Sequence, residues 1–78
     1  MSAIDRLSVW AVRYALGRAT YVVHDVVETL IANRAELSEQ SKATIIRDID
    51  EAAERYKVIG MQMDHEQWMR LRIALRPS

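Results

Sequence analysis

The sequence predicts an all-α protein, a small four-helix bundle in which residues 1–78 form a single helical domain. Apolar residues recur at helical spacing in four segments, capping residues precede several of them, and the chain has only two Gly and one Pro. A chain of 78 residues leaves no room for a second domain beside four helices.

Residues 3–16 are predicted to form the first helix. Ser2 can cap the free amides of the first turn, and Asp5 places negative charge where the helix dipole favours it. Gly17 suits the position just past the helix end. The face predicted to be buried carries Ile4, Leu7, Trp10, Ala11, Tyr14 and Ala15.

Residues 20–33 are predicted to form the second helix, with Thr20 as its cap. The valines of this segment would also suit a strand. However, polar residues line up opposite the apolar ones at a period of 3.6, which a strand would scatter. The predicted buried stripe consists of Val23, Val26, Val27, Leu30 and Ile31.

The third helix is predicted over residues 39–56, after the capping residue Ser38. Residues 57–64 interrupt the helical pattern, and Gly60 indicates a turn within them. The predicted buried stripe consists of Ile45, Ile46, Ile49, Ala52, Ala53 and Tyr56.

The fourth helix is predicted over residues 65–75. Asp64 and Gln67 have the spacing of a capping box, and Met63 and Trp68 have that of a hydrophobic staple. For the whole bundle, the predicted core consists of Leu7, Trp10, Tyr14, Val23, Val27, Leu30, Ile46, Ile49, Ala53, Trp68 and Leu71.

The first and fourth predicted helices carry more apolar residues than one core-facing stripe needs. The neighbouring helices and the Met-rich segment could cover the surplus, or it could form an interface with another protein or a second copy. A two-fold homodimer would let the same patch cover itself. The interface candidates are Val9, Val12, Leu16, Met69, Arg72, Ile73 and Arg76.

The composition argues against several functional classes. Without Cys, the chain has no Cys-based zinc site and no thiol nucleophile, which fits the cytoplasm. His24 and Glu28 could share a metal ion, but no third ligand falls on that helix face. The sequence has no glycine-rich phosphate loop and no Ser/His/Asp pattern, so we expect no enzyme activity, metal or cofactor. No apolar run is long enough to span a membrane.

Nucleic-acid binding is also disfavoured by charge. The formal net charge is zero, and the segment from Glu36 to Glu54 holds six acidic and two basic residues, which would repel phosphate. An acidic helix face can imitate a phosphate backbone, although an ordinary solvated face is the simpler interpretation. The acidic face consists of Asp48, Asp50, Glu51 and Glu54.

An ion pair is expected where the first helix ends. At least one of Arg13 and Arg18 should reach a carboxylate on the third helix, with Asp48 the first candidate. Such a partly exposed pair is worth about 1 kcal/mol or less, so its role would be to fix the angle between helices.

A motif that begins at Arg13 reads Arg-Tyr-Ala-Leu-Gly-Arg-Ala-Thr-Tyr, and the segments 47–49 and 64–68 read Arg-Asp-Ile and Asp-x-x-Gln-Trp. On these motifs, which run over most of the chain, the sequence resembles a group of small phage and prophage proteins of unassigned role. Ala19 stands where those proteins frequently have a second basic residue. The resemblance implies an accessory factor that binds and inhibits a host protein, and anti-CRISPR proteins are the most concrete such class.

The leading hypothesis is therefore a small phage-type accessory protein that acts by protein–protein binding in the host cytoplasm, for example by inhibiting a CRISPR-Cas complex. The alternatives are a small nucleic-acid-binding regulator that uses its Arg side chains and a structural homodimer without a separate partner. No residue of the sequence identifies the host partner.

Overall fold

Four α-helices and one short 3-10 helix make up the part of the chain that the computed structural model describes, residues 2–59 and 64–77. They confirm the predicted all-α fold and most of its helix boundaries. The α-helices are α1 (Ala3–Ala15), α2 (Thr20–Ala32), α3 (Glu39–Ile59) and α4 (His65–Leu75), and η1 (Arg34–Glu36) is the 3-10 helix before α3.

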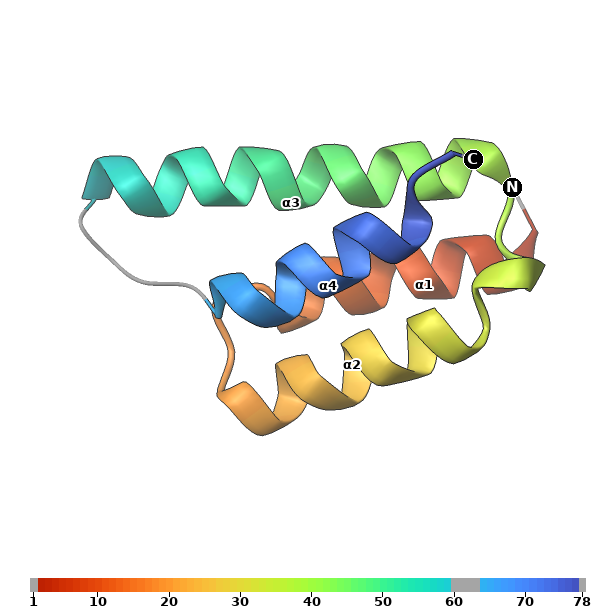
Figure 1. Cartoon of the computed structure of the whole chain (residues 1–78), viewed down its shortest axis with the longest axis horizontal. Coiled ribbons are helices and arrows are strands. Elements are labelled where there is room, and N and C mark those ends of the chain that lie inside the picture. Colours follow the sequence, from red (N-terminus) through yellow and green to blue (C-terminus); the bar gives the residue numbers. More distant parts are fainter. Residues whose placement is uncertain (1, 60–63, 78) are drawn as a thin grey trace.

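The helices form a bundle in which successive α-helices run in opposite directions (Figure 1). The molecule measures 35 × 21 × 21 Å along its principal axes. α1 packs against α2 and α3, and α4 packs against the same two helices. α1 and α4 therefore take diagonal positions in the bundle, and each has a side that faces away from its neighbours.

Side-chain caps begin α1 and α3 as the sequence predicts. Ser2 Oγ accepts a 3.2 Å hydrogen bond from the Asp5 amide, and the Asp5 carboxylate accepts one from the Ser2 amide, which together form a capping box. At α3, Ser38 Oγ accepts a 3.1 Å hydrogen bond from the Ser41 amide. Each cap satisfies amides that have no partner inside the helix.

The caps predicted for α2 and α4 are not formed. Ala19 precedes α2 and has no side-chain acceptor, while Thr20 is already the first helical residue. Asp64 does precede α4, but its side chain makes no hydrogen bond to the helix. Its backbone ψ is 73°, whereas the capping residue Ser2 has a ψ of 169°. The Asp64 backbone thus lacks the extended conformation from which a side chain reaches back to the helix.

α3 is longer than predicted. It continues to Ile59, three residues into the segment that was predicted to interrupt the helical pattern. Val58 in this last turn is exposed, so its position does not follow the apolar period of the buried stripe. The predicted turn residue Gly60 and the predicted staple residue Met63 lie outside the described residues.

Gly17 ends α1 with a φ of +80°, as expected for a residue just past a helix end. The Arg18 amide donates a 2.9 Å hydrogen bond to the Ala15 carbonyl, and α2 begins two residues later. A Cβ at position 17 would overlap the Tyr56 hydroxyl on α3. The corner between α1 and α2 therefore requires glycine both for its backbone conformation and for its close approach to α3.

Trp68 is the largest completely buried side chain. Its indole Nε1–H has no hydrogen-bond partner among the described residues, so Trp68 stabilises the core by apolar packing. The residues predicted for the core and found buried are Val23, Val27, Leu30, Ile49, Trp68 and Leu71. The other apolar residues found buried in the described part of the chain are Val9, Val12, Ala15, Leu37, Ile45, Ala52 and Leu75.

α1 buries the face opposite to the predicted one. Leu7, Trp10 and Tyr14 were predicted for the core, and all three are exposed. Val9 and Val12, predicted for an outer stripe, lie in the core instead. Both faces of α1 are apolar at helical spacing, so periodicity alone cannot distinguish them.

Side-chain size explains which face of α1 is buried. The buried face carries Asp5, Ser8, Val9, Val12 and Ala15, all of them small or medium in size. Because α1 packs against two helices at once, small side chains allow both neighbours to approach closely.

The buried stripe of α3 is rotated slightly from the predicted core. Ile45, Ile49 and Ala52 are completely buried, while Ile46 and Ala53 are only partly buried. Since α3 packs against both α1 and α4, some of its apolar residues contact one of these helices and some contact the other. Ile46 consequently lies at the edge of the contact between α3 and α4.

Candidate functional site

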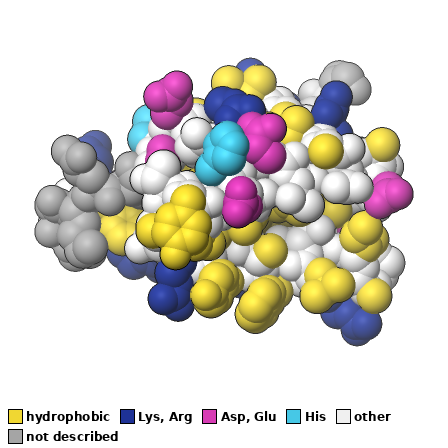
Figure 2. Space-filling model, turned by 90° about the horizontal axis from the view of Figure 1, so that it is seen from below, with side chains coloured by type: hydrophobic (Ala, Val, Ile, Leu, Met, Phe, Trp, Pro, Cys, Tyr) yellow, Lys and Arg dark blue, Asp and Glu magenta, His cyan; other side chains and the backbone are white. Residues whose placement is uncertain are grey.

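A row of large apolar side chains covers the outer face of α1. Ile4, Leu7, Trp10 and Tyr14 expose 38%, 65%, 63% and 47% of their surface, and we call these four residues the α1 ridge. They recur every three or four residues, so they share one helix face. Figure 2, in which α1 lies along the lower edge, shows hydrophobic side chains gathered there with Lys or Arg side chains beside them. Contiguous exposure of this kind is typical of an interaction surface.

The aromatic part of the α1 ridge has a defined geometry. The rings of Trp10 and Tyr14 stack with centroids 5.4 Å apart and planes inclined by 15°. The Arg18 guanidinium lies 4.7 Å from the centroid of the Tyr14 ring, and Arg18 Nε donates a 3.1 Å hydrogen bond to the Tyr14 carbonyl. These contacts restrict the rotamers of both rings, so binding would cost less side-chain entropy there.

A groove with basic walls runs beside the ridge, between α1 and α3, and has a volume of about 400 Å³. Within residues 2–59 and 64–77, neither Arg6 nor Arg47 forms an ion pair. Their two guanidiniums therefore give the groove positive charge. The basic groove, as we call it, is lined by Arg6, Val9, Trp10, Arg13, Thr44 and Arg47.

Arg13 pairs with Asp48, which confirms the ion pair predicted for the end of the first helix. Arg13 Nε lies 2.8 Å from Asp48 Oδ2, and this hydrogen bond and the negative charge of Asp48 raise the pKa of Arg13. The Asp48 side chain is only 10% exposed, whereas that of Arg13 is 57% exposed. The pair thus joins α1 to α3 while much of Arg13 stays accessible from the basic groove.

The predicted interface candidates do not form one surface. Val9 and Val12 are buried in the core, and Leu16 and Met69 are partly buried against it. Ile73 is 60% exposed, but it lies on α4, diagonally opposite α1. The prediction of a patch shared by these two helices is wrong, because α2 and α3 lie between them.

Two carboxylates of the predicted acidic face are paired with Arg. Asp48 is held by α1, and Asp50 Oδ1 lies 2.9 Å from Arg72 Nε on α4. The other two carboxylates, on Glu51 and Glu54, are exposed. Imitation of a phosphate backbone is therefore disfavoured, since half of the charges already stabilise contacts between helices.

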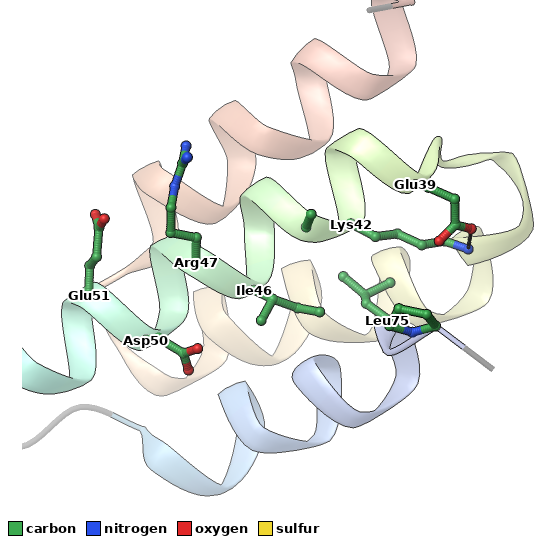
Figure 3. Close-up of a pocket in the computed structure, with 9 residues that line it drawn as sticks. Glu39, Lys42, Ile46, Arg47, Asp50, Glu51 and Leu75 are labelled. Carbon is green, nitrogen blue, oxygen red and sulfur yellow. Dashed lines mark hydrogen bonds and ion pairs between the residues drawn. The ribbon is translucent and has the colours of Figure 1, made fainter.

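A second groove lies between α3 and α4 (Figure 3) and has a volume of about 350 Å³. Ile46 and Leu75 line it from the two helices, and its rim carries charges of both signs. Lys42 on this rim pairs with Glu39 at 3.2 Å. The predicted interface residue Arg76, which follows α4, is exposed but does not line the groove.

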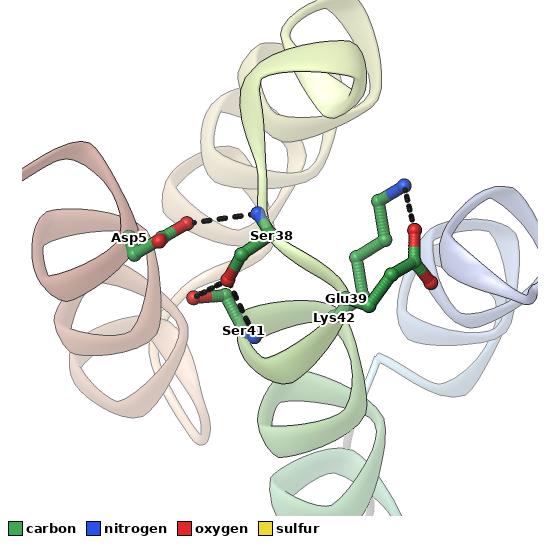
Figure 4. A network of polar contacts seen from close by, with 5 residues as sticks. All are labelled: Asp5, Ser38, Glu39, Ser41 and Lys42. Carbon is green, nitrogen blue, oxygen red and sulfur yellow. Dashed lines mark hydrogen bonds and ion pairs between the residues drawn. The ribbon is translucent and has the colours of Figure 1, made fainter. Parts of the chain in front are cut away.

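Buried Asp5 fixes which face of α1 points outward (Figure 4). Its Oδ1 accepts a 3.0 Å hydrogen bond from the Ser38 amide at the start of α3, and the Ser38 and Ser41 hydroxyls lie 3.2 Å apart beside it. The Ser38 amide and the nearby serine hydroxyls lower the pKa of Asp5 to about 2, although burial opposes this shift. With Asp5 turned toward α3, the α1 ridge on the other side of the helix faces solvent.

No protein-family model, curated protein or solved structure matches the chain. In the described part of the chain, no three His, Cys, Asp or Glu side chains are placed to hold a metal ion together. None of the described helices is both long and apolar enough to cross a membrane. The functional argument therefore depends on the chemistry of the α1 face.

Proposed function

We propose that this chain is a small protein-binding module that contacts its partner through the α1 ridge. The contiguous exposure of Leu7, Trp10 and Tyr14 on one helix face supports this proposal most directly. Trp, Tyr and Arg side chains contribute most of the binding energy in many protein interfaces. The outer face of α1 carries these residue types, because the stacked rings of Trp10 and Tyr14 lie beside Arg6 and Arg13.

A protein partner fits the α1 ridge better than a nucleic acid does. Single-stranded nucleic acids bind by stacking bases on free ring faces. Trp10 and Tyr14 already stack on each other, and the Arg18 guanidinium lies over Tyr14. Ile4 and Leu7 add aliphatic surface, which a protein interface can bury and which neither bases nor phosphates require.

The host is the proposed source of the partner. The motif that begins at Arg13 resembles small phage proteins, and such a protein could inhibit a bacterial defence complex, for example a CRISPR-Cas complex, by occupying one of its surfaces. Inhibition of this kind needs binding alone, without a catalytic group or a cofactor. The ridge supplies a surface suited to it.

Affinity capture from a bacterial lysate tests the proposed function. The baits are the tagged chain, its Leu7→Glu variant and its Ile73→Glu variant. Leu7 and Ile73 are similarly exposed but lie on diagonal helices, so Ile73→Glu is a matched control for adding a carboxylate. We expect the parent and Ile73→Glu to capture the same proteins and Leu7→Glu to lose them, with equal helix content by circular dichroism. Capture that Leu7→Glu leaves unchanged contradicts the proposal.

A further inference from the structure

We propose that the partner presents an acidic amphipathic helix to α1. This proposal rests on the proposed function and adds the chemistry of the partner. An apolar stripe of the partner helix packs along the α1 ridge, and carboxylates on one side of that stripe reach Arg6, Arg13 and Arg47 in the basic groove.

The α1 ridge has the spacing with which two helices pack side by side. Three residues of the ridge, Leu7, Trp10 and Tyr14, are separated by three and four positions, and exposed Ala3 lies four positions before Leu7 beside Ile4. This alternation of three and four is the repeat of a helix–helix seam. α1 has 13 residues, so it is about 20 Å long. A partner helix of similar length can cover the whole ridge. An added strand cannot bind in this way, because the backbone of α1 is hydrogen-bonded within the helix.

The charge beside the ridge is positive. Arg6 and Arg13 are seven residues apart on the same side of α1, and Arg47 lines the basic groove with them from α3. Asp48 and, more weakly, Glu51 offset Arg13, while Arg6 and Arg47 form no ion pair among the described residues. Asp5, the carboxylate of α1, is only 4% exposed. Carboxylates on a partner would therefore be attracted to this side of α1 and meet no exposed negative charge of the helix.

A second copy of this chain is a poorer occupant. If two α1 helices packed antiparallel about a two-fold axis, the side with Arg6 and Arg13 would face the same side of the other copy. Four guanidiniums would then meet, and only those of Arg13 have a carboxylate, that of Asp48, to offset them. The complementary partner is consequently an acidic helix of a different sequence.

Fluorescence anisotropy with two labelled peptides tests the proposal. Both peptides are designed helices of roughly three heptads with the same Leu stripe, flanked by Glu in one peptide and by Lys in the other. We expect the parent to bind the Glu peptide at least ~10-fold more tightly than the Lys peptide at low salt, and added salt to reduce the difference. The double variant Arg6→Glu, Arg47→Glu should lose this preference. Leu7→Glu should weaken binding of the Glu peptide, and Ile73→Glu should not.

Equal binding of the two peptides, including no binding of either, overturns the acidic-helix proposal. If lysate capture still depends on Leu7 in that case, the ridge binds a partner of other chemistry and the proposed function stands. A single-stranded oligonucleotide that binds more tightly than the Glu peptide overturns the proposal in favour of a nucleic acid. Light scattering at twice the chain mass, abolished by Leu7→Glu, overturns it in favour of a second copy.

Discussion

Asp5 connects the starts of two helices through one carboxylate. Its pKa in the folded protein is about 2, below the ordinary 3.8, because the Ser38 amide donates a hydrogen bond to the ionised form. We therefore expect its stabilisation to be complete above about pH 4 and to be lost as the pH falls from about 4 to about 2. Urea unfolding across this range should show a larger loss of stability for the parent than for Asp5→Asn.

The Asp5→Asn variant removes the charge and one of the two acceptor oxygens: the amide oxygen can still accept the hydrogen bond from Ser38, but the NH2 group cannot accept the one from the Ser2 amide. The second loss does not depend on pH, so the difference between the two pH profiles still reports the charge of Asp5. Glu28, whose pKa is lowered by its hydrogen bond from Arg70, is present in both proteins, so its contribution cancels in the comparison. Parallel pH profiles for the parent and the variant would show that Asp5 does not cause the acid dependence.

At Gly17, substitution by alanine should destabilise the protein by about 1–3 kcal/mol, because alanine adopts a positive φ reluctantly and its Cβ would overlap the Tyr56 hydroxyl. Thermal melts of Gly17→Ala alone and combined with Tyr56→Phe separate the two causes. The combined variant should recover part of the loss, since phenylalanine lacks the hydroxyl. A Gly17→Ala variant that melts like the parent would contradict the close approach of α1 to α3.

The buried face of α1 can be tested by truncating one residue on each side of the helix. Val12 is buried, so Val12→Ala should cost about 2 kcal/mol of stability. Leu7 is exposed, so Leu7→Ala should change stability by less than about 0.5 kcal/mol. Denaturant midpoints of both variants measure this contrast. The opposite order of stabilities would mean that the ridge is the core face.

The pair that joins α1 to α3 should be weak but measurable. Because the Arg13 side chain is more than half exposed, we expect a coupling of about 0.2–1 kcal/mol with Asp48 in a double-mutant cycle with alanine. A parallel cycle between Arg6 and Asp48 serves as the control and should show no coupling. Equal couplings in the two cycles would indicate a general charge effect instead of a specific contact.

Helix positions are predictable from this sequence because their signals are local. Ser2 and Ser38 precede helices, Gly17 follows one, and the spacing of the apolar residues indicates the helical segments between such signals. The orientation of α1 is not predictable in the same way. Both of its faces are apolar, and contacts with residues far away in the sequence decide which one is buried. The sequence does contain one signal for the buried face, which is Asp5 beside the small residues Ser8 and Ala15. A carboxylate on that face can be buried only if it has hydrogen-bond donors, and the Ser38 amide provides one.

At the scale of the whole molecule, the α1 ridge was not predicted because the sequence does not show which apolar face of α1 is buried. Trp10 and Tyr14 were predicted to lie in the core, so the ridge that they form on the surface was not predicted. Val9 and Val12 were predicted to lie in an interface, whereas they are buried in the core. The diagonal placement of α1 and α4 is a property of the packed bundle, which no single helix pattern contains.

Trp68 tests the bundle as a unit. Truncation by Trp68→Ala should cost about 3–5 kcal/mol, which is a large part of the stability of a domain this small. Trp68→Phe should cost less, because it keeps a ring and removes an indole N–H that has no partner among the described residues. Thermal unfolding followed by circular dichroism compares the two variants. A Trp68→Ala variant as stable as the parent would contradict the position of Trp68 in the core.

The chain's two tryptophans, one exposed and one buried, give it two separate optical reporters. Indole emission shifts to longer wavelength in water, so Trp10 should emit at longer wavelength than Trp68 and be quenched more readily by acrylamide. Trp68→Phe leaves a signal that responds to whatever covers the α1 ridge, and Trp10→Phe leaves one that responds to unfolding. Occupancy of the surface and integrity of the core can thus be followed independently by fluorescence.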